Sequence, residues 1–554
     1  MKRHRVLLIA CTALILTTIS CKQANKVGKL VPADASVVIH VNAEALSKKL
    51  SWDEIRNTDW FREMYKEGST DSVAKKLMEN PEASGIDSKS DLLFFMKKQG
   101  NGGYFAFTGS VKNAGDFEAF NKKLNSQSTV TKANGTSSIN FSNGVVSWDE
   151  KRFIYLTNAP MANVPGMPKG NGDEQLPSSF PADSLRFFAR QLFELDGDNS
   201  LGKEDKFSDM LKEEGDMHFY VNSGQLYNSM GGGMMSMMKL NVLFEGNVST
   251  TSIKFEDGKI TLKSHQYYGK EMSDLMDKYD SKKIDKAVIN RIPSQNVVAL
   301  FTMNYPPEGL KEFLRLIGVD GVVNGYLGKI NYSMEEFIKA NKGDLLISFS
   351  DFSMSSKSIE IPNPDGGAPF RQTQTVPDIK VLFATSINDK AAFDKLVTTL
   401  KKETAEMPQA GIPQITYNIN NNWFAASNSP EFVTQFLAGG KTTQPYADKL
   451  DGAVYGGFID LQKLFKGMQT SSADSSSKAV MDASVKMWQD VIFTAGEFNK
   501  GKITSDGVVN LVDKNTNSLK QLNRYLDLMA KNINRQRFNA SGNADGDTTV
   551  VFPK

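Results

Sequence analysis

The sequence of 554 residues is poor in cysteine and histidine, with two cysteines, Cys11 and Cys21, and four histidines. Cys11 lies in an N-terminal hydrophobic segment that we expect to be removed, and the single remaining thiol cannot form an internal disulfide. The H-E-x-x-H pattern of zinc peptidases and the G-x-S-x-G pattern of serine hydrolases are both absent. The composition therefore excludes a disulfide-stabilised fold and gives no linear signature of either enzyme class.

A transmembrane helix is also missing from the N-terminus. The hydrophobic segment Val6–Leu16 is too short, since a spanning helix needs about 20 residues. It follows Lys2, Arg3 and Arg5, as in an export signal. We predict that residues 1–20 are a lipoprotein signal peptide. Their removal takes away three positive charges and no negative ones, which changes the formal net charge from +2 to −1. A nucleic-acid partner is not expected, because the mature chain has no basic excess.

Cys21 follows Thr18, Ile19 and Ser20, and this stretch resembles a loose bacterial lipobox. The resemblance implies cleavage after Ser20 and acylation of both the Cys21 thiol and its new amino group. Several acyl chains anchor a protein stably where one would not. The alternative is an ordinary signal peptide with an incidental cysteine. Residues 21–29 would be a lipidated tether; they contain no acidic residue, which favours an outer-membrane lipoprotein that faces the periplasm. No cofactor beyond this lipid is expected.

Six segments of the mature chain recur later in the sequence in the same order. The pairs are 30–50 with 291–314, 90–96 with 343–349, 104–124 with 381–400, 152–160 with 422–430, 218–230 with 456–468, and 256–262 with 505–511. We therefore predict a tandem duplication. The first repeat unit is placed at 30–280 and the second at 291–530, followed by a polar C-terminal tail at 531–554.

Local patterns within each repeat indicate strands with interspersed helices. Apolar residues alternate along 37–42, as a half-buried strand requires. Ser51 with Glu54, and Ser333 with Glu336, form capping-box patterns that predict helix starts. Asp257-Gly258 lies between two alternating segments, which predicts a hairpin. The fold class is therefore α+β, with an antiparallel sheet and helices packed on one face. Segments 231–240 and 353–378 differ between the repeats and are predicted to be loops.

Three weaker motifs favour structural interpretations. His40, His218 and His265 lie in separate extended segments without ligand partners at metal-binding spacing, so we predict that they lie on sheet surfaces. The acidic stretch 195–205 fails the EF-hand order and is predicted to be a turn between helices. The glycines of "AGGKT" (438–442) are predicted to end a helix, since a phosphate loop would need a further glycine at 435.

The least ordinary feature is a cluster of methionines at the start of the 231–240 segment. Its members are Met230, Met234, Met235, Met237 and Met238. Thioethers bind soft Cu(I), and methionines also form adaptable contact surfaces for partners. Both interpretations remain open.

The lipobox at Cys21, the opening "VPADASVVIHVNAEAL" (31–46) and its degenerate return "IPSQNVVALF" (292–301) together resemble a family of large outer-membrane lipoproteins from Bacteroidota that is known mainly as a domain of unknown function. The resemblance implies a location and an architecture, and no catalytic residues.

The leading hypothesis is a non-enzymatic, lipid-anchored binding or assembly module whose partner is another envelope protein or a glycan. The alternatives are a hydrolase-like envelope enzyme assembled from distant residues, and soft-metal binding at the methionine cluster.

Overall fold

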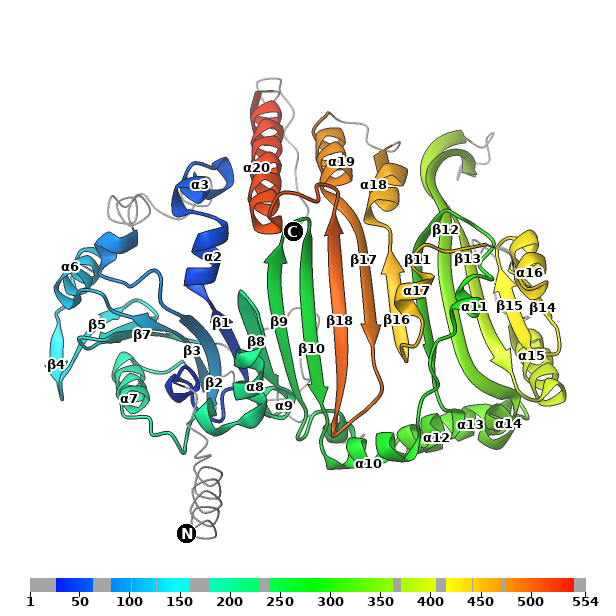
Figure 1. The fold of residues 1–554 in the computed structure, drawn as a ribbon, viewed down its shortest axis with the longest axis horizontal. Helices are drawn as coiled ribbons and strands as arrows, with labels where there is room; N and C mark the ends of the chain where they lie inside the picture. Colours follow the sequence, from blue (N-terminus) through cyan, green and yellow to red (C-terminus); the bar gives the residue numbers. More distant parts are fainter. Residues whose placement is uncertain are drawn as a thin grey trace, which may run out of the picture. The chain divides into compact units, whose positions relative to one another are not determined.

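The computed structural model of the chain describes residues 26–62, 81–100, 102–125, 127–159, 179–229, 239–361, 370–404, 415–440, 442–469 and 475–542 (Figure 1). These residues contain helices and 18 strands, and every strand pairing among them is antiparallel. The predicted α+β class is confirmed. The chain divides into two compact units, Met1–Glu44 with Asn80–Gly231, and Ala45–Glu79 with Gly232–Lys554.

The strands of the first unit pair in the order β8–β1–β2–β3–β7–β6–β5–β4. Their bounds are β1 Val37–Val41, β2 Leu92–Gln99, β3 Gly102–Ser110, β4 Thr131–Ala133, β5 Thr136–Phe141, β6 Gly144–Trp148, β7 Arg152–Asn158 and β8 Met217–Asn222. The alternation predicted for 37–42 is present in β1, where Val38 and His40 are buried and Val37, Ile39 and Val41 are half-buried.

Helices cover the first unit at several points. They are η1 Gly28–Leu30, η2 Pro81–Ser84, α6 Ala114–Leu124, α7 Ala182–Phe193, η3 Leu201–Lys203, α8 Asp205–Lys212 and α9 Ser223–Ser229, while α2 Ala43–Lys49 crosses the division between the units in the sequence. Phe117 of α6 is fully buried and stacks on Phe153 of β7, with ring centroids 5.3 Å apart. Trp148 of β6 meets the Phe117 ring edge-on, with ring centroids 5.6 Å apart. Burial of these aromatic rings contributes to the stability of this core.

The second unit contains the longer series of paired strands, in the order β9–β10–β18–β17–β16–β11–β12–β13–β15–β14. Their bounds are β9 Val248–Glu256, β10 Lys259–Tyr267, β11 Val297–Asn304, β12 Asn341–Ile361, β13 Phe370–Ile387, β14 Thr416–Ile419, β15 Trp423–Ser427, β16 Tyr455–Ile459, β17 Trp488–Ala495 and β18 Lys502–Leu511.

Helices line both ends of these strands and cover one face. Their bounds are α3 Trp52–Arg56, η5 Leu240–Leu243, α10 Lys270–Lys278, α11 Lys286–Ile289, α12 Pro307–Leu316, α13 Asp320–Lys329, α14 Met334–Ala340, α15 Lys390–Thr404, α16 Pro430–Leu437, α17 Ala447–Leu450, α18 Leu461–Gln469, α19 Ser475–Met487 and α20 Ser518–Gly542. In Figure 1, α10, α12, α13 and α14 follow the lower ends of the strands. The main core packs α11, α16 and α17 against β11, β12, β13, β15 and β16.

The segments matched in the sequence occupy corresponding places in the strand order. The order β8–β1–β2–β3–β7 of the first unit corresponds to β16–β11–β12–β13–β15 of the second. The hairpin β9–β10 follows β8 in the sequence as the hairpin β17–β18 follows β16. The duplication stays a prediction, and this correspondence supports it. The compact units and the predicted repeats have different boundaries, since residues 45–79 and 232–280 lie in the second unit.

The predicted helix starts and hairpin are confirmed. Ser51 and Glu54 form a full capping box at α3, and Ser333 accepts a hydrogen bond from the Glu336 amide at α14. A hydrogen bond from Lys520 of α20, together with those from the Ser51 amide and hydroxyl, lowers the pKa of Glu54 to about 2. The β9–β10 hairpin turns at Asp257-Gly258, where Gly258 has a φ of 68°. Local hydrogen-bonding patterns thus determine where these elements begin.

The predicted loop at 353–378 is wrong, because most of it is strand. β12 and β13 continue past the strands beside them, and residues 353–361 pair with 370–378 as a two-stranded ribbon. The sequence of this ribbon is largely polar on both faces and lacks the apolar alternation that marks a half-buried strand. The α20 helix likewise continues to Gly542, so the predicted polar tail at 531–554 is helical in its first part.

Candidate functional site

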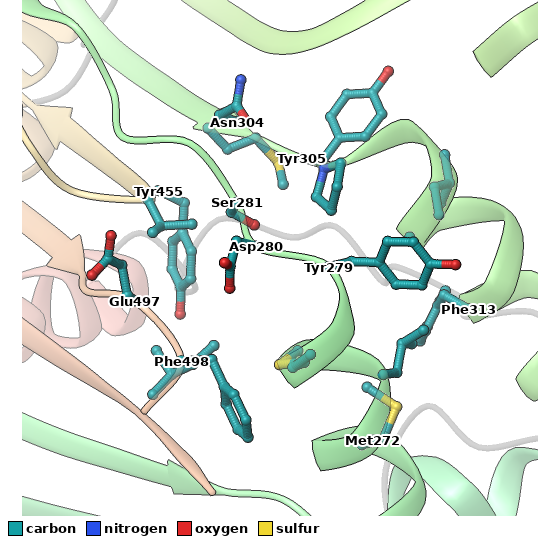
Figure 2. Close-up of a pocket in the computed structure, with 18 of the residues that line it drawn as sticks. Met272, Tyr279, Asp280, Ser281, Asn304, Tyr305, Phe313, Tyr455, Glu497 and Phe498 are labelled. Atoms are coloured by element: carbon teal, nitrogen blue, oxygen red, sulfur yellow. The ribbon is translucent and has the colours of Figure 1, made fainter. Parts of the chain in front are cut away.

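The second unit contains a cavity of about 660 Å³ between two helices and the ends of three strands (Figure 2). Pockets of roughly 300–1,000 Å³ are typical of small-molecule sites. The described lining residues come from four separate segments of the chain. They are Tyr268, Met272, Leu275, Met276, Tyr279, Asp280 and Ser281; Met303, Asn304, Tyr305, Pro306, Gly309, Leu310 and Phe313; Val454 and Tyr455; and Gly496, Glu497, Phe498 and Ile503.

One wall of the cavity is α10. Met272, Leu275 and Met276 follow one another at helical spacing and lie on one face of the helix, and Tyr279 is its C-cap residue. Met272 is buried and the other three are half-buried. The apolar stripe of α10 is therefore turned toward the cavity and not toward a filled core.

A second wall is α12, which begins with Pro307 at its first turn, where proline is favoured. Leu310 and Phe313 lie three residues apart on this helix and both line the cavity. Figure 2 shows Phe313 on the same side of the view as Tyr279. Gly309 allows the helices to approach closely, because a Cβ there would lie 3.0 Å from Cβ of Tyr279. Side chains of α10 and α12 thus set the width of the cavity.

The corner where β11 ends is held by buried hydrogen bonds. Asn304 is buried, donates through Nδ2 to Asp344 Oδ1 at 2.7 Å, and accepts from the Lys282 amide at 3.0 Å. The Tyr305 amide donates to the Gly343 carbonyl oxygen at 2.9 Å. Asn304 is therefore a positioning residue for the corner, since its polar atoms are already engaged by the protein.

Four of the eight polar side chains in the described lining are tyrosines. Burial, together with the neighbouring Tyr455, raises the pKa of Tyr268 to about 12. Burial also raises the pKa of Tyr305. These phenols stay neutral at physiological pH. Two acidic side chains, Asp280 and Glu497, are exposed at the margin, where Figure 2 shows them on the same side of the view as Tyr455.

The described lining combines a few polar groups with a large apolar surface. It contains Ser281, Asn304, Asp280, Glu497 and four tyrosines, and no histidine, cysteine or lysine. Within the described residues, no group of three or more histidine, cysteine, aspartate or glutamate side chains could hold a metal ion. Apart from the polar side chains, the lining is a surface of aromatic rings, thioethers and aliphatic carbons, which holds apolar molecules by excluding water.

The residues predicted from the sequence do not form this cavity. Cys21 and the cluster of Met230, Met234, Met235, Met237 and Met238 lie outside the described residues. The lining was missed because its four segments are far apart in the sequence. The apolar stripe from Met272 to Tyr279 was a usable signal, since it is followed at once by the polar run "DSKK" (280–283).

The prediction that the histidines lie on sheet surfaces is wrong, because His40, His218 and His265 are all buried. His40 and His218 lie opposite each other on β1 and β8, with their Nδ1 atoms 3.1 Å apart. His218 Nε2 lies 3.1 Å from the Glu213 carbonyl oxygen, which can only accept, so His218 Nδ1 accepts from His40. Burial lowers the pKa of His218. The pair joins two strands inside the first unit.

The predicted turn between helices at 195–205 and the predicted helix end at Gly439-Gly440 are both confirmed. Within 195–205, Asp196 accepts hydrogen bonds from the amides of Asp198 and Asn199, and the segment connects α7 to α8. Gly439 and Gly440 follow α16 with φ values of 104° and 57°. Glycine adopts such values readily and commonly ends helices.

Comparison with known proteins identifies a domain without assigning it a function. Residues 28–174 match the family described as "Domain of unknown function (DUF4836)", so this part of the chain contains a domain of unknown function. No curated protein matches the chain. No helix in the described part combines the length and hydrophobicity needed to cross a bilayer.

Crystal structures of TP0453 are similar to part of the chain. Crystal form I is 11% identical, with a TM-score of 0.25, and the match covers 47% of this chain and 87% of that one. Crystal form III is 13% identical, with a TM-score of 0.25 and coverage of 49% and 87%. Scores of this size are too low to indicate a shared overall fold.

Proposed function

We propose that the protein is a lipid-anchored envelope protein that binds an apolar small molecule, without catalysis, in the cavity between α10 and α12. The observation that carries this proposal is the cavity of about 660 Å³ with its aromatic and thioether lining. A cavity of that size exposes apolar surface to water in the absence of a ligand. Filling it with an apolar molecule stabilises the complex by about 25 cal/mol for each Å² removed from water.

Blocking the cavity is expected to weaken binding of the neutral apolar dye N-phenyl-1-naphthylamine by about tenfold or more, which corresponds to about 1.4 kcal/mol. The double variant Met276→Trp/Leu310→Trp places a large ring on each wall, α10 and α12. Titration of the purified protein, followed by dye fluorescence, measures the affinity.

The matched control is Val322→Trp/Tyr326→Trp on α13, where both side chains are exposed. This control should bind the dye as the parent does. Equal affinity in the parent and the blocked variant would show that the dye binds elsewhere, and the proposal would be wrong. Circular dichroism of both variants confirms that they are folded.

The anchor is tested separately. Cys21→Ala removes the thiol that the lipobox resemblance assigns to acylation, so the protein is expected to move from the membrane fraction to the soluble fraction of cells. Mass spectrometry of the parent N-terminus should find acyl groups on Cys21. A variant that stays in the membrane fraction, with the parent unmodified, would contradict the outer-membrane lipoprotein assignment. Neither result changes the expectation for dye binding.

A further inference from the structure

We infer that the cavity selects apolar molecules with a positively charged head, of the alkylammonium class, over molecules of equal chain length with a carboxylate head. The inference rests on the proposed function, because it assigns the ligand class of the same cavity. Three features support it: the aromatic rings of the lining, its acidic side chains, and the engagement of two neighbouring lysines.

Aromatic rings surround the space. Four tyrosines and two phenylalanines line it, namely Tyr268, Tyr279, Tyr305, Tyr455, Phe313 and Phe498. The face of an aromatic ring carries a negative electrostatic potential and attracts cations, most strongly where water is displaced. One ring already takes a cation, since Lys278 Nζ lies 5.0 Å from the centroid of Tyr279.

The charged groups of the lining are both acidic. Asp280 and Glu497 reach the cavity, and no described lining residue is basic. Asp280 has no ion pair with any described residue, and it lies in the view between Tyr455 and Tyr279 (Figure 2). A carboxylate head placed here would be repelled by Asp280, whereas an ammonium head would be attracted.

Two lysines close to the lining in the sequence are already engaged. Lys283 Nζ lies 3.3 Å from Glu497 Oε1, and Lys278 Nζ lies over the Tyr279 ring. An anionic ligand that used either ammonium group would have to displace its contact. Because the ion pair offsets part of the Glu497 charge, Asp280 is the main determinant of the preference.

Displacement of N-phenyl-1-naphthylamine by three compounds with the same chain tests the inference. Dodecyltrimethylammonium, dodecanol and dodecanoate are each used below the concentration at which they form micelles. We expect the ammonium compound to bind about tenfold more tightly than the carboxylate, a difference that one cation–π contact and one nearby carboxylate can supply. Dodecanol should fall between them.

Asp280→Asn should reduce the preference to about threefold or less while leaving dodecanol affinity unchanged, since it removes one interaction with the charged head. Asp277→Asn is the matched control: it removes the same charge from the exposed side of α10, outside the lining, and should keep the preference.

The outcomes separate the two proposals. If all three compounds displace the dye equally, or if Asp277→Asn acts as Asp280→Asn does, the charge selection is wrong and apolar binding stands. If the carboxylate binds most tightly, the inference is reversed. If the dye binds in the cavity but none of the three compounds displaces it, the cavity does not bind alkylammonium compounds and the inference is wrong. If the dye itself does not bind, the proposed function is wrong and the inference fails with it.

Discussion

Phe436→Ala is expected to lower the free energy of unfolding by about 3–5 kcal/mol, the usual cost of deleting a fully buried phenylalanine ring. Phe436 of α16 has no exposed surface, and its ring meets Trp423 of β15 edge-on with centroids 5.5 Å apart. The guanidinium of Arg291 lies 5.9 Å from the same ring. Truncation therefore leaves a cavity where α16 packs against β15.

Urea denaturation followed by tryptophan fluorescence measures this loss, because Trp423 reports on the site directly. Phe349→Ala is the control, since it deletes the same atoms from a ring that is 37% exposed on β12. Its cost should be at least about twofold smaller, because less apolar surface is lost from the interior. Equal losses in the two variants would contradict the packing assigned to Phe436.

The α+β class could be predicted because it depends on local patterns. Ser51 and Glu54 identify the start of α3 from four residues, and Asp257-Gly258 identifies the hairpin from two. In each case the physical cause lies within a few residues of its effect: an amide that needs an acceptor, or a backbone conformation that glycine adopts without strain.

The contacts between distant strands could not be predicted in the same way. His40 and His218 are 178 residues apart and become neighbours only because β1 pairs with β8. Treated singly, each histidine in an extended segment indicates an exposed sheet position. The strand order, which puts them face to face inside the unit, is determined by the whole chain.

The cavity could not be predicted from the sequence for a related reason. Its walls are ordinary amphipathic helices, and an apolar stripe such as that of α10 normally predicts contact with a core. Whether the stripe meets other side chains or an open space depends on where α12 and the end of β11 lie. The positions of Met272 and Phe313 therefore indicate the apolar faces of the two helices. They do not indicate that a cavity lies beside those faces.

Gly343→Ala is expected to cost about 2–4 kcal/mol of unfolding free energy, from backbone strain together with steric overlap. Gly343 lies at an irregularity in β12 and has a φ of 103°, a conformation that alanine rarely adopts. A Cβ at this position would also overlap the carbonyl oxygen of Tyr305. Since Tyr305 cannot stay where it is, the cavity corner must move as well.

Gly439→Ala separates the two causes. Gly439 has a nearly identical φ of 104°, yet a Cβ there would have no neighbour within 4 Å. It should therefore cost only the strain, about 1–2 kcal/mol, and should leave dye binding unchanged. The Gly343 variant should lose both stability and affinity for N-phenyl-1-naphthylamine. If the two variants are equally stable and bind the dye equally, Tyr305 is not held by close contact with Gly343. A selective loss in Gly343→Ala would instead link the bend of β12 to the shape of the cavity, so that one glycine maintains both the strand and the binding site.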